Sequence, residues 1–415
     1  MAGEPRSYRL ALGGTLALLA AILLWNVARY PPGGGYDAVD HISYADGIVH
    51  GRLPAHGTGE YYTPPLFYAL AGSATWVGRR AGLGEPHRVA QLFDAGCLLA
   101  TALLVLALAR LLWPERRTLH IAAVAFLALL PVTVKTAAMF HPETLDLLLS
   151  TLALYLGARM LVRRSYRLPE TVALGLVLGA GQLTRAFSLW TFGAVFLVLA
   201  LVRQWRALAV VVAVTAAVAA PWYVHQAREY SSPVFDRPTQ HKPLWERRPL
   251  GFYVDPGVPE VVTRPYRPSY RNRAIPTTYT EAWGDYFGIW VWKGNGSPGA
   301  AARRELRLQS LVGLLPSLLA LVGWLLLLAR SRRRPERLLV ALLPALGILG
   351  YLYFTVSYPT RDGDVLKGTY LLTIAAPLAL AFGYALDRLP RRALLAVTAL
   401  LVAGAVAELP FLLYG

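Results

Sequence analysis

Cysteine, methionine and charged side chains are scarce in this chain of 415 residues. It has one Cys, three Met and 16% charged residues, against 55% hydrophobic residues. The single Cys97 cannot form an intrachain disulfide, and its place in an apolar stretch indicates a packing role. This apolar fraction exceeds what the core of a soluble protein of this size usually needs. The composition therefore indicates an integral membrane protein.

Acidic residues are also few compared with basic ones. The chain has 24 Asp and Glu against 41 Lys and Arg, a formal net charge of +17. Such an excess could indicate a nucleic-acid partner. Most of it lies, however, in short segments beside apolar stretches, where Lys and Arg orient membrane helices by facing the cytoplasm. We therefore expect membrane lipids as partners and no nucleic acid.

What the chain does have is a series of apolar stretches from Leu10 to Leu413. Each could cross a hydrocarbon core of about 30 Å as a helix. The sequence thus predicts an all-α integral membrane protein, a polytopic helical bundle of about eleven transmembrane helices. The predicted spans are 10–29, 88–112, 118–135, 143–162, 171–185, 187–203, 206–224, 309–329, 337–356, 368–387 and 391–413.

Basic clusters determine how the chain threads through the membrane. If every cluster is cytoplasmic, the N-terminus lies inside, the C-terminus lies outside, and the protein is a multi-pass protein of the cell membrane. The apolar piece from Leu66 to Val77 is too short to span, so we expect interfacial helices in the first external loop. The clusters are Arg6/Arg9, Arg110/Arg116/Arg117, Arg163/Arg164/Arg167, Arg203/Arg206, Arg330 to Arg337 and Arg388/Arg391/Arg392.

Three regions follow from this threading. Residues 1–224 form an N-terminal transmembrane catalytic module with a first external loop at 30–87. Residues 225–308 form a large extracytoplasmic loop, and residues 309–415 form the C-terminal transmembrane helices. The conspicuous polar residues gather on the external side, where we expect the functional site.

The first external loop carries the densest group of polar side chains. If its segment from Ala38 to His50 is helical, one side of that helix presents two carboxylates, an imidazole and a phenol, because positions three and four apart are neighbours. A simpler interpretation is a helix N-cap with solvated polar neighbours. The four residues are Asp37, Asp40, His41 and Tyr44.

Other polar residues sit at predicted external corners. Glu143 would open the fourth span, where an acid suits the helix dipole and could simply stabilise the helix start. Arg185 and Lys367 are cations at external helix ends, where snorkelling side chains also anchor helices. Glu60, Tyr62, His141 and Tyr370 complete the set.

In their order along the chain, these motifs resemble the GT-C glycosyltransferases, specifically the group of protein O-mannosyltransferases and lipid A aminoarabinose transferases. The resemblance covers approximately residues 10 to 390. The matching elements are Asp37-x-x-x-His41 with Tyr44, Gly51-x-Leu53-Pro54, Glu60-Tyr61-x-x-Pro64-Pro65, His141-Pro142-Glu143, Leu183-Thr184-Arg185 and Lys367-Gly368-Thr369-Tyr370.

The resemblance implies an inverting transferase that takes a sugar from a polyprenyl-phosphate carrier to a lipid, glycan or protein acceptor outside the cytoplasm. It makes Asp37 the general base and Glu60 the second carboxylate. Many relatives have Asp-Glu where this chain has Asp37-Ala38, which leaves Asp40 as a rival base. Aminoarabinose transferases have Lys where this chain has Thr63, which argues against that sugar. The implied substrate-binding residues are His41, Tyr44, Tyr62, His141, Glu143, Arg185, Lys367 and Tyr370.

Two questions stay open at the level of sequence. A divalent metal ion is a candidate cofactor, yet spacing alone identifies no metal, and hard ions would want more oxygen ligands than can be assigned. The alternative function is a transporter or flippase for a lipid-linked or anionic substrate, which would be expected to show paired repeats and polar residues at mid-membrane depth. In the long external loop, Trp283, Tyr286, Trp290 and Trp292 could stack on sugar rings or anchor the loop at the interface.

Overall fold

The computed structural model describes residues 5–231, 242–270, 273–284, 298–357 and 365–414, and this part of the chain contains helices, turns and bends but no strand. The all-α expectation is confirmed. The longest helices are α1 (Arg6–Arg29), α4 (Arg88–Leu112), α7 (Glu143–Arg163), α10 (Trp205–Glu229), α15 (Ala300–Arg330), α16 (Pro335–Ser357) and α18 (Arg391–Leu412). Shorter ones in the bundle are α5 (Arg117–Leu129), α6 (Pro131–Thr136), α8 (Leu168–Gln182), η1 (Ala186–Ser188), α9 (Leu189–Leu201), η4 (Gly368–Ile374) and α17 (Ala375–Leu386).

Eight helical segments of the described chain are long and apolar enough to cross a membrane, namely the seven longest helices and the segment Gly368–Leu386. The polytopic membrane fold is thereby confirmed, while the count of eleven stays a prediction. The predicted span 118–135 is interrupted, because Pro131 ends α5 and begins α6. The 13 residues of α5 cover only about 20 Å, less than a hydrocarbon core.

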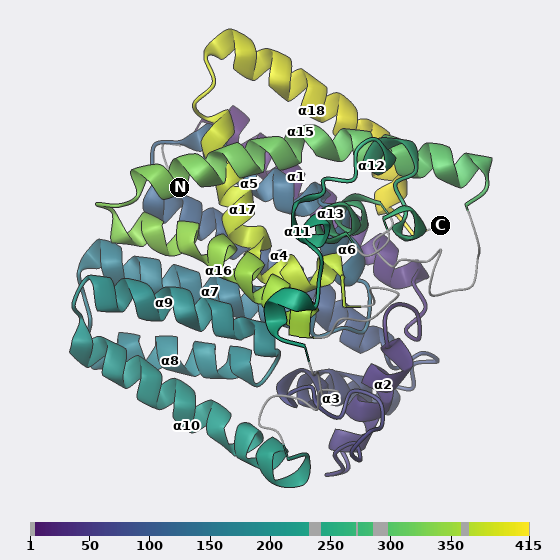
Figure 1. Cartoon of the computed structure of the whole chain (residues 1–415), viewed down its shortest axis with the longest axis vertical. Coiled ribbons are helices and arrows are strands. Elements are labelled where there is room, and N and C mark those ends of the chain that lie inside the picture. The colour runs from purple at the N-terminus through teal and green to yellow at the C-terminus, as the bar shows by residue number, and fades with distance from the viewer. Residues whose placement is uncertain (1–4, 232–241, 271–272, 285–297, 358–364, 415) are drawn as a thin grey trace.

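The bundle is built from neighbouring helix pairs. The helices α8 and α10, α15 and α17, α5 and α17, and α4 and α7 pack against each other. Figure 1 shows α8, α9 and α10 together on one side of the bundle and α15 and α18 on another. Within this bundle the main core is made of small and branched apolar side chains, so close helix packing supplies the van der Waals contacts that hold membrane helices together.

Two short helices of the first external loop pack on each other beside the bundle (Figure 1). These are α2 (Ala38–Ile48) and α3 (Leu66–Arg80). They meet closely at Gly72, where an added Cβ would lie 2.4 Å from the carbonyl oxygen of Ala45. Phe67 and Tyr68 of α3 are fully buried in the cluster that this packing forms. The cluster also includes Cys97 of α4 and Leu145 of α7, so it packs the loop against the bundle.

The described part of the segment between α10 and α15 also contains helices. It contains η2 (Leu244–Glu246), α11 (Leu250–Val254), α12 (Glu260–Thr263), η3 (Arg267–Ser269) and α13 (Ala274–Trp283). The flanking helices extend into it, because α10 runs to Glu229 and α15 begins at Ala300. Trp283 is buried and donates from Nε1 to Ser317 Oγ at 2.9 Å, which is a packing role. Tyr286, Trp290 and Trp292 lie outside the described residues.

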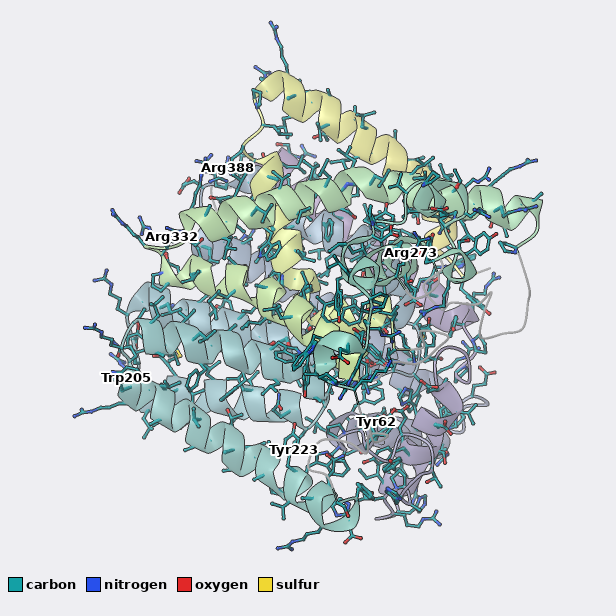
Figure 2. All side chains as sticks on the ribbon, in the orientation of Figure 1. Tyr62, Trp205, Tyr223, Arg273, Arg332 and Arg388 are labelled. Carbon is teal, nitrogen blue, oxygen red and sulfur yellow. The ribbon has the colours of Figure 1, made fainter. Side chains whose placement is uncertain are left out.

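Three of the predicted cytoplasmic basic clusters lie toward a different end of the bundle from Tyr62 and Tyr223 (Figure 2). Figure 2 shows Trp205, Arg332 and Arg388 along one edge, with Tyr62 and Tyr223 toward the other. Contacts agree for the basic end: an Arg116 guanidinium nitrogen lies 3.3 Å from Asp387 Oδ2. This separation is what the predicted threading requires, and which end faces the cytoplasm stays a prediction.

Cysteine labelling on intact cells should show the sidedness. In a Cys97→Ala background, Leu250→Cys on α11 should react with an impermeant thiol reagent, because only an external position keeps the basic clusters inside. Arg332→Cys, in the turn after α15, should react only once the membrane is opened. Leu250 and Arg332 are both exposed, so access to the thiol is not limiting. Reaction at 332 alone would reverse the threading.

Candidate functional site

A cavity opens between the first external loop, the corner after α8, and η4. Its empty space, together with the open solvent at its mouth, is about 620 Å³. Seven of the eleven predicted site residues line it: Asp37, His41, Glu60, Tyr62, His141, Arg185 and Tyr370. Two more, Glu143 and Lys367, contact these residues directly. The structure thus brings together residues that are more than 300 positions apart in the sequence.

Arg185 is the central cation of the cavity. Its guanidinium pairs with Glu143 Oε1 in a short contact, and it lies 3.5 Å from Thr63 Oγ1 and 3.9 Å from Glu60 Oε2. Arg185 and both acids are buried. Buried ions of opposite charge stay charged only when they are paired and hydrogen-bonded, and this group meets that condition.

Local sequence explains why these side chains meet. The backbone of Arg185 is extended between the end of α8 and η1, which turns its side chain out of the helical path. The amide of Leu66 donates to the carbonyl of Leu183 at 2.8 Å, so the first loop is tied to the same corner. Pro142 forms the N-cap position of α7 and places Glu143 in its first turn.

A second cation approaches from η4. Lys367 Nζ lies 3.2 Å from Asp37 Oδ2 and 4.4 Å from the ring centroid of Tyr36. Asp37 occupies the N-cap position of α2 with φ 51°, and its side chain makes no cap hydrogen bond. The simpler interpretation of Asp37 as a helix cap is therefore wrong. Its carboxylate is 48% exposed, so an external hydroxyl group could reach it.

Two carboxylates of the first loop line the cavity, Asp37 and Glu60, and Glu60 is the buried one. The hydroxyl of Thr63 donates to Glu60 Oε2 at 2.6 Å. Burial raises the pKa of Glu60 above its ordinary value, and the nearby Arg185 and the Thr63 hydroxyl offset only part of this rise. Glu60 therefore loses its charge at a higher pH than an ordinary glutamate does.

Two histidines close one side of the cavity. The rings of His41 and His141 meet edge to face at 4.9 Å between centroids. His41 Nδ1 and the Tyr68 hydroxyl are hydrogen-bonded at 2.8 Å, and His141 Nδ1 contacts Glu143. Burial, and then the neighbouring His141, Arg185 and Lys367, hold the pKa of His41 well below its usual range. His41 is therefore neutral near pH 7 and can accept or donate a hydrogen bond at the cavity.

Aromatic rings line the remaining wall. Tyr370 stacks on Phe187 with ring centroids 5.1 Å apart, and Phe354 meets Tyr370 edge to face. The Lys367 ammonium lies 5.5 Å from the Tyr370 centroid and the Arg185 guanidinium 5.7 Å from it. One phenol ring thus lies beside both cations, and its face is suited to an apolar or sugar surface.

Asp40 and Tyr44 do not line this cavity, contrary to the expected single helix face. Asp37 precedes α2 with a left-handed backbone, so the spacing of an ideal helix does not apply to it. Asp40 and Tyr44 instead line a second cavity of about 1180 Å³, which Glu60 also borders. Tyr44 is buried and stacks on Tyr68 at 3.9 Å. The expectation that these four residues share one face is wrong.

Several cavity residues were not predicted from the sequence. Tyr223 and Gln226 come from the end of α10, where Gln226 Nε2 donates to the Tyr62 carbonyl at 2.7 Å. Phe187 and Phe354 come from segments that read only as apolar. Polar residues at the end of an apolar helix were the one available signal, and they mark Tyr223 and Gln226 but not the phenylalanines.

The side chains that could ligate a divalent metal by their chemistry are not grouped into a metal site; they are Asp37, Asp40, His41, His141 and Glu143. Asp37 and Asp40 line different cavities, and Glu143 is held by Arg185. Within the described ranges, no three His, Cys, Asp or Glu side chains are grouped so that they could hold a metal ion. We therefore derive no step of the chemistry through a metal.

The helical bundle has the same fold as solved structures of ArnT and AglB, which are members of the GT-C group that the sequence resembles. No protein-family model matches the chain, and no curated protein matches it. Among solved structures, the chain is similar to ArnT from Cupriavidus metallidurans bound to undecaprenyl phosphate. The TM-score is 0.51 at 19% identity, and the match covers 94% of this chain and 62% of ArnT.

Archaeal oligosaccharyltransferase AglB from Archaeoglobus fulgidus, in complex with an inhibitory peptide and a dolichol-phosphate, is also similar. Its TM-score is 0.56 at 14% identity, covering 97% of this chain and 56% of AglB. A complex of the Archaeoglobus fulgidus oligosaccharyltransferase with Zn and sulfate matches with a TM-score of 0.55, 15% identity and 95% and 51% coverage. The chain therefore spans between half and two thirds of the length of these structures, and the likeness shows the fold.

Proposed function

We propose that this chain is a membrane-embedded glycosyltransferase that moves a sugar from a polyprenyl-phosphate carrier to an acceptor on the extracytoplasmic face. The observation that carries this proposal is the cavity itself, where two cations, Arg185 and Lys367, lie beside two carboxylates, Asp37 and Glu60. Solved structures of the same fold hold undecaprenyl phosphate or dolichol-phosphate, which supports a lipid phosphate as the donor's carrier. The acceptor is a lipid, a glycan or a protein.

The proposed step is a direct displacement with inversion at the anomeric carbon. The acceptor oxygen attacks that carbon while Asp37 takes the hydroxyl proton as general base. The bond from the anomeric carbon to the phosphate oxygen breaks, and its electron pair stays with the polyprenyl phosphate. Arg185 and Lys367 stabilise the negative charge that develops on this phosphate.

Exposure and charge support this division of roles. Asp37 is half exposed, so an acceptor can approach it from outside. Arg185 is buried, so a phosphate bound beside it would be largely desolvated. In such a water-poor site, a preset cation stabilises developing charge more strongly than it would in bulk water. Asp40 borders the second cavity and is not assigned to the chemistry.

A transfer assay tests the proposal. Membranes containing the protein would be given a panel of radiolabelled polyprenyl-phosphate sugars, and release of free polyprenyl phosphate together with labelled product would be measured. We expect turnover with at least one donor. Movement of intact donor between leaflets of proteoliposomes without cleavage would instead support the transporter or flippase alternative. Tyr62 and Tyr223, which line the cavity, lie away from the edge that holds Trp205, Arg332 and Arg388 (Figure 2), and this one-sided placement favours the enzyme.

As the pH is lowered, the rate of transfer should begin to fall at a higher pH than it would if the limb were set by a glutamate with its ordinary pKa. Ionised Glu60 orients Arg185, and because burial raises its pKa, Glu60 loses its charge earlier as pH falls. Glu60→Gln should lower the maximal rate and move the acid limb of the pH profile to lower pH. A variant profile with the same acid limb as the wild type would assign that limb to another group.

A further inference from the structure

Glu281, a buried carboxylate on α13, contacts residues next to the cavity without lining it. Glu281 on α13 is 1% exposed. Its Oε1 accepts a hydrogen bond from the Tyr36 hydroxyl at 3.0 Å and a short contact from the Arg267 guanidinium. Its Oε2 accepts the backbone N–H of Gly368 at 2.6 Å. One side chain of the long external segment thus joins two loops that are far apart in sequence.

Each of these two loops carries one member of the ion pair between Lys367 and Asp37. Tyr36 immediately precedes Asp37, and Gly368 immediately follows Lys367. The Tyr36 ring also lies under the Lys367 ammonium. Because Glu281 binds the neighbours of both residues, it fixes the distance between the backbone positions of Asp37 and Lys367.

Lys367 is held on its other side as well. The Arg267 guanidinium donates to the carbonyl of Leu366 in a short contact. The backbone on the two sides of Lys367 is therefore bound by the two members of one buried ion pair, Arg267 and Glu281. At Gly368, an added Cβ would lie 3.2 Å from the amide nitrogen of Ala282 and 3.2 Å from Glu281 Cβ. Because Gly368 has no side chain, the backbone at this position can pack directly against α13.

Such a buried ion pair costs much desolvation energy and adds little net stability against a well-packed apolar replacement. What it does specify is one geometry, because Glu281 accepts from all three of its donors only when the three segments are in place. A side chain that served only packing would not need to accept from three donors on separate segments.

We propose that Glu281 is a positioning residue that sets Lys367 for contact with the phosphate of the lipid carrier. This inference rests on the proposed function, in which Lys367 binds that phosphate. It also gives the external segment a role in the reaction, since α13 sets the geometry of a cavity that it does not line.

The test is a double-mutant cycle on binding of undecaprenyl phosphate to the full chain in nanodiscs. Glu281→Gln keeps the size of the side chain but presents an N–H group where an acceptor is needed. It should weaken binding by about tenfold in the wild-type background and by no more than about twofold in a Lys367→Ala background. Equal loss in both backgrounds would show that Glu281 acts only on the fold and would overturn the inference.

Failure of the proposed function gives a different result. If the wild type does not bind undecaprenyl phosphate, the lipid-carrier proposal fails and this inference falls with it. If the wild type binds and Glu281→Gln binds equally well, only the inference is wrong. Asp255→Asn is the matched control, because it removes a carboxylate of the same segment that pairs with Arg273 at 2.8 Å, and it should leave binding unchanged.

A milder variant serves if Glu281→Gln does not fold. Tyr36→Phe removes one of the three hydrogen bonds to Glu281 and keeps the ring beneath Lys367. It should weaken binding by about threefold, and this loss should disappear when Lys367 is Ala. A Tyr36→Phe loss that persists in the Lys367→Ala background would contradict a role exerted through Lys367.

Discussion

Asp37→Asn should lower sugar transfer by roughly 100-fold or more, which corresponds to about 2.7 kcal/mol of transition-state stabilisation. Asn keeps the size of Asp and can still accept a hydrogen bond from Lys367, which lies 3.2 Å from Asp37 Oδ2. It cannot take a proton from the acceptor hydroxyl. Binding of undecaprenyl phosphate should therefore survive, and only turnover should fall.

Asp40→Asn is the control for this variant. Asp40 lies three residues along the same loop, is exposed, and borders the other cavity. A general need for negative charge in this loop would make both variants equally poor. Retained activity in Asp37→Asn with loss in Asp40→Asn would move the base to Asp40, and activity in both would remove the first loop from the chemistry.

The helical membrane fold could be predicted because its signal is local. Each apolar stretch that crosses a membrane must satisfy its own backbone, so length and hydropathy suffice to find it. The start of α7 at Glu143 and the short helix α3 followed from the same pattern, whereas the helix α2 was considered only from its polar motif. The interruption at Pro131 was not predicted, because apolar residues continue on both sides of this proline and length and hydropathy alone indicate one span.

The site was less predictable, because helix periodicity does not describe the residues that flank a helix. Asp37 has a positive φ and lines a different cavity from Asp40, although the two residues are only three positions apart. Glu281 showed no signal, since its three partners come from segments that only the tertiary structure brings together. Phe187 and Phe354 could not be distinguished from residues that face lipid.

Arg185→Ala should reduce transfer by an order of magnitude or more, because the variant removes the buried cation that would stabilise the leaving phosphate. It should also destabilise the protein, by about 3 to 5 kcal/mol, because Glu143 would be left as a buried charge without its partner. Thermal unfolding and transfer would both fall, so Arg185→Ala alone cannot separate the two effects.

The double variant Arg185→Ala/Glu143→Gln separates them. It removes the cation and the charge that the cation neutralises, so most of the lost stability should return. Transfer should stay at least about tenfold below that of the wild type, because no cation faces the phosphate from this corner. Arg110→Ala, at the far end of α4, should change neither the rate nor the binding of undecaprenyl phosphate. Full recovery of transfer in the double variant would show that Arg185 serves the fold alone, and the phosphate would then depend on Lys367.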